Sequence, residues 1–193
     1  EAEDYEVYAR SVFNPEKRAL FIAGDVTSRY NRRSEEEYFN IARYIEEIVK
    51  NRHGNYMVFC PSYAFLQKVY EKYTENFGGE DRECMIQSDY MTEADREAFL
   101  GRFQGKGGMD SQTEKALRAA VTMDIEEDED RILIGFCVLG GIFGEGIDLK
   151  NDELIGAVIV GTGLPQVCFE REMLKDFFDG EGEDGCDYSY RYP

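Results

Sequence analysis

Long hydrophobic runs are absent from the sequence. The longest stretches without a charged residue, 132–144 and 154–169, are shorter than the roughly 20 apolar residues that cross a bilayer. The N-terminus lacks the basic segment and following apolar segment of a secretory signal. We therefore expect a cytoplasmic protein with no membrane partner. With 193 residues, 42% of them hydrophobic, the chain can fill the core of one domain.

Metal-site and hydrolase signatures are also missing. The five cysteines form no CxxC pair, and the only histidine is His53. A metal or cluster site would have to be assembled from distant positions, so we predict none. Cys60 and Cys137 lie in apolar runs and are expected to be buried, reduced thiols. Neither G-x-S-x-G nor H-E-x-x-H occurs, which leaves no recognisable hydrolytic constellation.

Complete nucleotide-binding fingerprints are lacking as well. A P-loop requires G-x-x-x-x-G-K-[ST], whereas residues 101–107 (GRFQGKG) have a different spacing and no Ser or Thr. Residues 140–146 (GGIFGEG) and 161–166 (GTGLPQ) both depart from the dinucleotide pattern G-x-G-x-x-G/A. We infer that the chain cannot hold a nucleotide unaided.

Basic residues are outnumbered, because 22 Lys and Arg face 40 Asp and Glu, giving a net charge of −18. This acidity argues against nucleic acid as a ligand. It is, however, concentrated in residues 1–6, 124–130 and 176–187, which hold 4, 6 and 6 acidic residues and no basic ones. We expect these segments to form a terminus, an insertion and a late loop. A locally basic face can then exist elsewhere.

Short apolar runs alternate with amphipathic segments. Ser34 and Glu37 form a capping-box pattern before a helix that should stop near Gly54, and Thr92 with Asp95 begins another helix. The expected strands are residues 18–24, 56–60, 83–87, 131–137 and 154–161, and a further helix carries an apolar face from Phe65 to Phe77. The runs 131–137 and 154–161 are continuously apolar, as strands buried on both faces require. The alternation predicts a parallel α/β sheet with helices on both sides.

Residues 104–130 interrupt this alternation. They contain GKGGMDS, a short helical pattern at 112–121 and the acidic run at 124–130. We interpret them as an acidic insertion within a single domain formed by residues 1–193. Its role is open between a solvated spacer and a mimic of phosphate.

Three of the expected strands end in polar or glycine-rich loops. Ser62 and Tyr63 follow the strand 56–60, the glycine turn (residues 140–149, GGIFGEGIDL) follows 131–137, and Gly161 ends the last strand. The carboxyl ends of parallel strands line one edge of a sheet, where ligands bind. These loops therefore favour a site, although tight strand exits would explain any single one of them equally well.

Two charged groups near these loops allow alternative interpretations. Glu145 and Asp148 of the glycine turn could act as paired acid and base, but no substrate pocket is evident around them. Arg29, with Tyr30 and further arginines, suits the phosphates and bases of a single strand. Alternatively, Arg33 pairs with Glu36 or Glu37 in the following helix, a surface interaction of little energy.

Taken in order, these residues resemble the second RecA-like domain of superfamily 2 helicases of the DinG/XPD-like class. Residues 55–71 (NYMVFCPSYAFLQKVYE) look like motif IV, a buried strand that ends in a Pro-Ser turn and a helix. Residues 132–165 look like motif V, in which a strand leads to a glycine-rich turn, a Glu-Gly-Ile-Asp signature and a further strand ending in Leu-Pro. Residues 11–15 (SVFNP) are similar to the segment that opens this domain. The resemblance implies a RecA-like three-layer sandwich, a central mainly parallel sheet with helices on both faces.

The resemblance also implies that the chain is the second RecA-like domain of an ATP-dependent helicase that acts on DNA, with DNA repair as its process. In this family two RecA-like domains clamp ATP and Mg²⁺ between them, and single-stranded or duplex DNA contacts both domains. Carried over to this sequence, the residues near the nucleic acid are Ser62, Tyr63, Gly140 and Gly141. Arg29 is assigned to the same ligand because its guanidinium suits phosphates, and not because of the resemblance. The residues that link the nucleic acid to the nucleotide cleft are Gly144, Glu145, Gly146 and Asp148, with Asp148 on the nucleotide side.

Two parts of the family pattern are not in this sequence. The P-loop and acidic Mg²⁺ motif belong to the first RecA-like domain, and motif VI, Gln-x-x-Gly-Arg-x-x-Arg, would follow the final residues YSYRYP. The motif VI arginine would act on the transferring phosphate. We therefore expect a domain truncated before motif VI and inactive alone. The alternative is a stand-alone nucleic-acid-binding or regulatory module with a degenerate RecA-like fold and no ATPase activity.

Overall fold

The computed structural model describes residues 15–105, 131–162 and 167–191. Within these residues, four parallel strands form one sheet in the order β2-β3-β1-β4. The strands are β1 (Gly54–Cys60), β2 (Arg82–Ile86), β3 (Ile132–Val138) and β4 (Gly156–Ile159). The α-helices are α1 (Glu35–Val49), α2 (Tyr63–Phe77), α3 (Glu93–Phe103) and α5 (Phe169–Gly180). Short helical turns are η1 (Pro15–Lys17), η2 (Tyr30–Arg32), η3 (Asn151–Glu153) and the π-type turn η4 (Asp187–Arg191).

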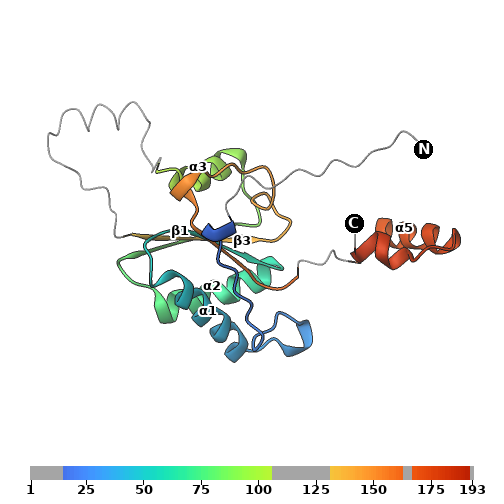
Figure 1. The fold of residues 1–193 in the computed structure, drawn as a ribbon, viewed down its shortest axis with the longest axis horizontal. Helices are drawn as coiled ribbons and strands as arrows, with labels where there is room; N and C mark the ends of the chain where they lie inside the picture. Colours follow the sequence, from blue (N-terminus) through green and yellow to red (C-terminus); the bar gives the residue numbers. More distant parts are fainter. Residues whose placement is uncertain (1–14, 106–130, 163–166, 192–193) are drawn as a thin grey trace.

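Helices cover both faces of the sheet. Figure 1 shows α1 and α2 on one side and α3 on the other. A first core cluster joins α1 and α2 to the sheet through residues such as Ile45, Phe65 and Phe136, and a second joins α3 to it through Phe99 and Phe103. The predicted fold class, a three-layer α/β sandwich with a parallel sheet, is confirmed.

Strand β3 is the centre of the fold, and all seven of its residues are buried. It pairs in parallel with β1 on one side and β2 on the other. A Cβ at Gly135 would lie 2.7 Å from Cζ of Phe103, so the glycine allows α3 to pack closely against the strand. The continuous apolar run predicted a strand buried on both faces, and this prediction is confirmed for β3.

Side-chain caps begin the helices at the predicted residues. Thr92 and Asp95 form a complete capping box, because the Asp95 amide donates to the Thr92 hydroxyl (3.2 Å) and the Thr92 amide donates to the Asp95 carboxylate (2.9 Å). At α1 the Glu37 amide donates to Ser34, but the Glu37 carboxylate accepts from the Thr27 amide instead of the Ser34 amide. The predicted stop near Gly54 is wrong: α1 ends at Val49, and Gly54, with φ of 138°, opens β1.

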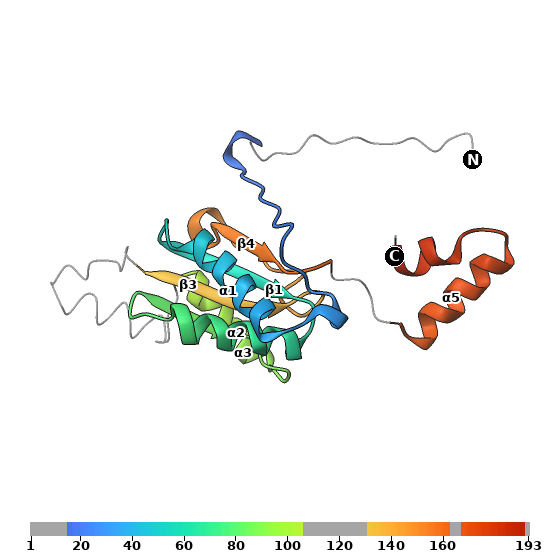
Figure 2. The same cartoon turned by 90° about the horizontal axis from the view of Figure 1, so that it is seen from below.

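Residues 18–24 do not form the predicted first strand. They form an irregular segment, and the side chains of Leu20, Phe21 and Ile22 are 79%, 83% and 88% exposed. Figure 2 shows this segment leaving the body near β4. An apolar run becomes a strand only where a neighbouring strand supplies hydrogen-bond partners, and none pairs with it in the described part of the chain.

Strand β4 lies at the edge of the described sheet and is shorter than predicted. It spans four residues, and alternate side chains are exposed, with Ile159 66% exposed. The prediction of burial on both faces is therefore wrong for this strand.

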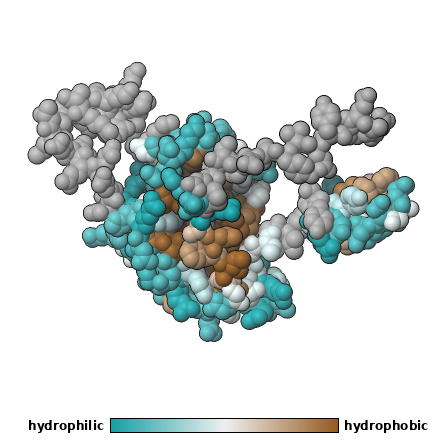
Figure 3. Space-filling model, in the orientation of Figure 1, coloured by the Kyte–Doolittle hydropathy of each residue, from teal (hydrophilic) through white to brown (hydrophobic). Residues whose placement is uncertain are grey.

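In Figure 3, apolar surface gathers near the middle of the molecule, where the N-terminal segment crosses the sheet in the view of Figure 1.

The predicted insertion falls mostly outside the described residues. Helix α3 ends at Phe103, and β3 begins at Ile132. The short helix at 112–121 and the acidic run 124–130 both lie outside the described residues, as does the acidic segment 1–6.

Helix α5 packs against η4, and both lie apart from the sheet in Figures 1 and 2. The rings of Phe178 and Tyr188 stack with their centroids 4.0 Å apart. Residues 176–180 of the predicted acidic loop are helical, so that prediction is wrong in this part. In the part of the chain that the structure describes, no helix has the length and hydrophobicity of a membrane span.

Four of the five cysteines divide into two groups that chemical labelling should separate. Burial raises the pKa of the Cys60 and Cys137 thiols to about 12, whereas Cys168 and Cys186 are exposed. Because only the thiolate reacts with iodoacetamide, we expect Cys168 and Cys186 to be alkylated in the folded chain at pH 8. Cys60 and Cys137 should react only after unfolding, as peptide mass spectrometry would detect. Labelling of Cys137 at the rate of Cys186 in the native chain would contradict the described packing.

Candidate functional site

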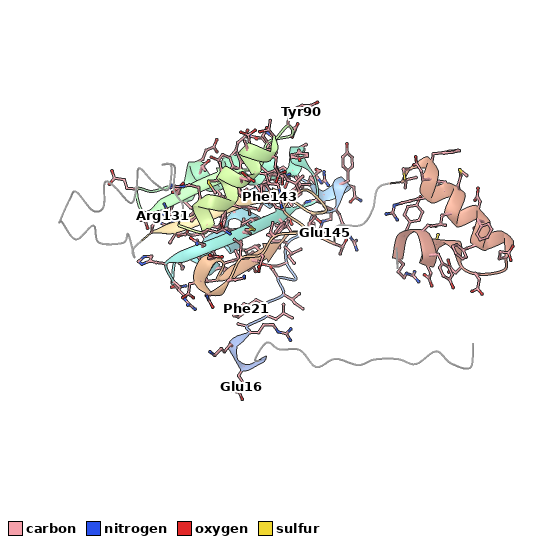
Figure 4. All side chains as sticks on the ribbon, turned by 90° about the horizontal axis from the view of Figure 1, so that it is seen from above. Glu16, Phe21, Tyr90, Arg131, Phe143 and Glu145 are labelled. Carbon is pink, nitrogen blue, oxygen red and sulfur yellow. The ribbon has the colours of Figure 1, made fainter. Side chains whose placement is uncertain are left out.

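The loops that follow β1, β3 and β4 share one edge of the sheet. The strands run in the same direction, with Cys60 opposite Val138 and Phe59 opposite Ile159, so their carboxyl ends lie together. Figure 4 places Glu145 at this exit edge and Arg131 at the opposite end of the sheet. The convergence expected from parallel strands is confirmed by this register.

Glycines shape the turn after β3. The Gly141 amide donates to the Val138 carbonyl (3.1 Å), and the Gly144 amide donates to the Gly141 carbonyl (2.8 Å). Gly140 and Gly146 have φ values of 69° and 68°, in the left-handed region that glycine adopts without strain. The close succession of these turns explains why the chain uses four glycines here.

The Phe143 side chain anchors the glycine turn to the core. This side chain is 1% exposed and stacks on Phe99 of α3, with ring centroids 4.5 Å apart. Phe99 in turn stacks on Phe103 at 5.8 Å. A single aromatic residue thus connects an otherwise glycine-rich loop to the core under α3.

Arg96 of α3 holds the turn by its backbone. Its guanidinium donates to the carbonyls of Gly146 (3.2 Å) and Ile142 (3.4 Å), and also to the Glu93 carboxylate (3.0 Å). Neither Arg96 nor Phe143 is among the residues that the sequence pattern predicts for the site. An aromatic residue between glycines was the only local signal for Phe143, and nothing in the sequence pointed to Arg96.

The two predicted carboxylates are presented to solvent. Glu145 and Asp148 are both exposed, and Asp148 forms an ion pair with Lys150 at 3.0 Å between side chains that are 78% and 71% exposed. The carboxylate raises the pKa of Lys150 through a hydrogen bond and charge attraction. Such an exposed pair is weak, so Asp148 can exchange Lys150 for another partner at little cost.

The start of α2 brings Ser62 and Tyr63 to the same exit edge. Ser62 is the N-cap, and its hydroxyl accepts from the Phe65 amide at 3.4 Å. Tyr63 is the first helical residue, and its hydroxyl accepts from the side-chain amide of Gln87 at 2.9 Å. The N-terminus of this 15-residue helix carries the positive end of its dipole.

Gln87, which sequence analysis did not single out, connects Tyr63 to the glycine turn. It follows β2 directly and is 3% exposed. Its side-chain oxygen accepts from the Val138 amide at 2.9 Å. Beside it lies an open groove of about 430 Å³ lined by Tyr63, Leu66, Gln67, Ile86, Gln87, Ser88, Asp89 and Tyr90.

The segment that carries Arg29 also lies at the exit edge. A side chain at Gly161 would overlap the Ser28 hydroxyl, which places this segment against the end of β4. The Arg33 guanidinium lies over the rings of Phe65 (4.9 Å to the centroid) and Tyr30 (5.3 Å), and its Nε donates to the Ser28 carbonyl at 3.1 Å. These contacts replace the ion pair with Glu36 or Glu37 that sequence analysis considered for Arg33.

The structure therefore brings most of the sequence-predicted site residues to one edge. The groups gathered there are Arg29 on its segment, Ser62 and Tyr63 on α2, and Gly140, Gly141, Gly144, Glu145, Gly146 and Asp148 in the glycine turn. Among residues 15–105, 131–162 and 167–191, no group of three or more His, Cys, Asp or Glu side chains is placed to hold a metal ion.

The family model of the helicase C-terminal domain matches residues 45–193 of this chain. The chain therefore belongs to the helicase C-terminal domain family. Two solved structures have a similar fold: XPD_APO, with a TM-score of 0.55, and XPD_Helicase, with a TM-score of 0.51, each 20% identical in sequence. The alignments cover 88% and 86% of this chain but only 29% and 25% of those chains. The predicted resemblance to the C-terminal domain of DinG/XPD-like helicases is confirmed.

Proposed function

We propose that this chain is the second RecA-like domain of an ATP-dependent DNA helicase. It contributes one wall of an ATP cleft and part of a track for single-stranded DNA. The glycine turn is the observation that carries the proposal. Its two carboxylates are exposed, while Phe143 and Arg96 fix the backbone beneath them. Exposed carboxylates on a backbone that is fixed in this way can respond to a ligand that another domain binds.

On the nucleotide side, Asp148 and Glu145 fit a ligand whose phosphates are bound elsewhere. Exposed carboxylates accept hydrogen bonds from hydroxyls and from water bound to Mg²⁺. They repel phosphate oxygens, and the sequence offers no P-loop to attract them. The first RecA-like domain would therefore bind the phosphates of ATP together with Mg²⁺, and this chain would close the cleft from the other side.

On the nucleic-acid side, the start of α2 and the beginning of the glycine turn offer groups suited to a phosphodiester backbone. The α2 N-terminus favours anions, and Tyr63, the first residue of this helix, carries a hydroxyl group. A Cβ at Gly140 would have no atom within 4 Å, so the backbone there is open to a ligand, and Gly141 follows it with no side chain of its own. Arg29 supplies positive charge from the adjacent segment, which matters in a chain with a net charge of −18.

Hydrogen exchange of a polypeptide that holds both RecA-like domains tests these assignments. Adding a non-hydrolysable ATP analogue should slow exchange at residues 144–148, and adding a single-stranded oligonucleotide should slow it at 61–63 and 140–141. The opposite end of the sheet, around Arg131, serves as the internal control. Protection confined to that end, or none at the exit edge, would refute the proposal.

Alone, the chain should not hydrolyse ATP. It has neither the P-loop nor the acidic Mg²⁺ motif that would hold a nucleotide. We expect phosphate release from ATP at the buffer rate, with or without single-stranded DNA, in a coupled phosphate assay. Turnover that persists after repeated purification and follows the concentration of the chain would contradict the assignment of the phosphate site to another domain.

A further inference from the structure

Gln87 joins three segments through one buried side chain. Its backbone amide donates to the Phe136 carbonyl at 2.8 Å and so continues the pairing of β2 with β3. Its side-chain oxygen accepts from the Val138 amide, and its nitrogen donates to Tyr63. A Cβ at Gly141 would lie 3.1 Å from the same nitrogen, so the glycine turn packs directly on the amide.

The chemistry of these partners fixes the direction of each hydrogen bond. A backbone amide can only donate, so the side-chain oxygen of Gln87 must face Val138 and its NH₂ group must face Tyr63. The Tyr63 hydroxyl is therefore the acceptor in this bond. Its own proton remains for a second acceptor, which can be an anion at the start of α2.

We propose that Gln87 is a positioning residue that fixes the exit of β3 and turns the Tyr63 hydroxyl so that its proton is donated to a backbone phosphate of single-stranded DNA. The inference rests on the nucleic-acid role proposed above for Tyr63. Gln87 itself need not touch the ligand, because it acts through Tyr63 and through the Val138 amide.

Two substitutions separate the effect of Gln87 on the exit of β3 from its effect on the Tyr63 hydroxyl. Gln87→Met removes both hydrogen bonds and leaves the Val138 amide without its partner. Gln87→Glu keeps an acceptor for Val138, but its carboxylate accepts from Tyr63 and reverses the hydroxyl. Gln67→Glu is the matched control, because it adds the same charge to the same groove from an exposed position on α2.

A pH profile distinguishes this reversal from simple damage to the fold. Burial raises the pKa of the introduced carboxyl. The titratable groups that line the groove are Tyr63 from α2 and Asp89 and Tyr90 from the loop after β2, and the Asp89 charge acts in the same direction. Once protonated, the carboxyl donates to Tyr63 as the amide does. Oligonucleotide affinity of the Gln87→Glu variant relative to wild type should therefore fall at high pH and recover as the pH falls through this raised pKa.

The test uses fluorescence anisotropy with a single-stranded oligonucleotide and the two-domain polypeptide, from pH 5.5 to 8.5. At pH 8.5 we expect Gln87→Glu and Tyr63→Phe each to weaken binding about tenfold, the double variant to be no weaker, and Gln67→Glu to remain within about twofold of wild type. A constant ratio of Gln87→Glu to wild-type affinity across the pH range would overturn the inference. Unchanged binding by Tyr63→Phe would do the same.

Hydrogen exchange of the Val138 amide is the second readout, and it requires no ligand. Exchange should be about tenfold faster in Gln87→Met and unchanged in Gln87→Glu. Equal rates in wild type and Gln87→Met would overturn the role at the β3 exit. If wild-type polypeptide binds no oligonucleotide at all, the proposed function fails and the role of the Tyr63 proton fails with it. Normal wild-type binding combined with a flat pH ratio overturns the inference alone.

Discussion

Replacing Phe143 by alanine is expected to lower the free energy of unfolding by about 3–5 kcal/mol, the range for a fully buried phenylalanine. The ring is 1% exposed and stacks on Phe99 of α3 at 4.5 Å. Its removal leaves a cavity between α3 and the glycine turn, and it also removes the main side-chain anchor of that turn. Urea denaturation followed by circular dichroism would measure the loss.

The neighbouring residue Ile142 provides the control. It is 42% exposed on the same turn, so Ile142→Ala should change stability by less than about 0.5–1 kcal/mol. Equal losses for the two variants would show that Phe143 is not an anchor. If Phe143→Ala still folds, hydrogen exchange at residues 140–147 should rise more than at β1, because the turn loses its anchor while β1 keeps its pairing.

Replacing Asp148 by alanine is expected to reduce DNA-stimulated ATP hydrolysis of the two-domain polypeptide on the order of 100-fold, the scale for loss of one group that acts in the transition state. Stability should change little, since the carboxylate is exposed and its ion pair is with the equally exposed Lys150. Glu145→Ala should act in the same direction, because Glu145 lies on the same anchored turn. Steady-state turnover at saturating oligonucleotide would measure both.

Asp152→Ala is the matched control for charge. Asp152 is 92% exposed and lies 3.9 Å from Arg52, in η3 before β4 begins, and therefore away from the exit edge. This variant should hydrolyse ATP at the wild-type rate. If Asp148→Ala and Asp152→Ala had the same activity, the role assigned to Asp148 would be refuted.

Most of the fold could be predicted because its local signals agree with its packing. The capping residues Ser34 and Thr92 mark helix starts, and β1 and β3 are apolar runs that are in fact buried. Residues 18–24 carry an equally strong apolar signal, yet they form no strand. Strand formation depends on a pairing partner, and a partner cannot be read from the run itself.

The residues that hold the loops of the site in place could not be predicted, for a related reason. Gln87 contacts Val138 across 51 positions of sequence, and Arg96 contacts Gly146 across 50. Such contacts arise only when β2 and α3 are folded against β3. The residues exposed at the exit edge were found from the loops that carry them, whereas the residues that hold those loops were not.

The four glycines of the turn illustrate the difference. Their number pointed to a tight and functional exit, and the left-handed φ values of Gly140 and Gly146 agree with a tight turn. Which side chain fixes that turn depends on Phe143 entering the cluster around Phe99, a matter of tertiary packing.

The most direct test of the central claim is the coupling of ATP hydrolysis to nucleic acid. ATP turnover should be measured with and without single-stranded oligonucleotide for a polypeptide that joins this chain to a P-loop RecA-like domain, and for the P-loop domain alone. The account predicts that oligonucleotide stimulates turnover at least about tenfold in the joined polypeptide and has no effect on the P-loop domain alone. Equal turnover and equal stimulation in the two samples would contradict it.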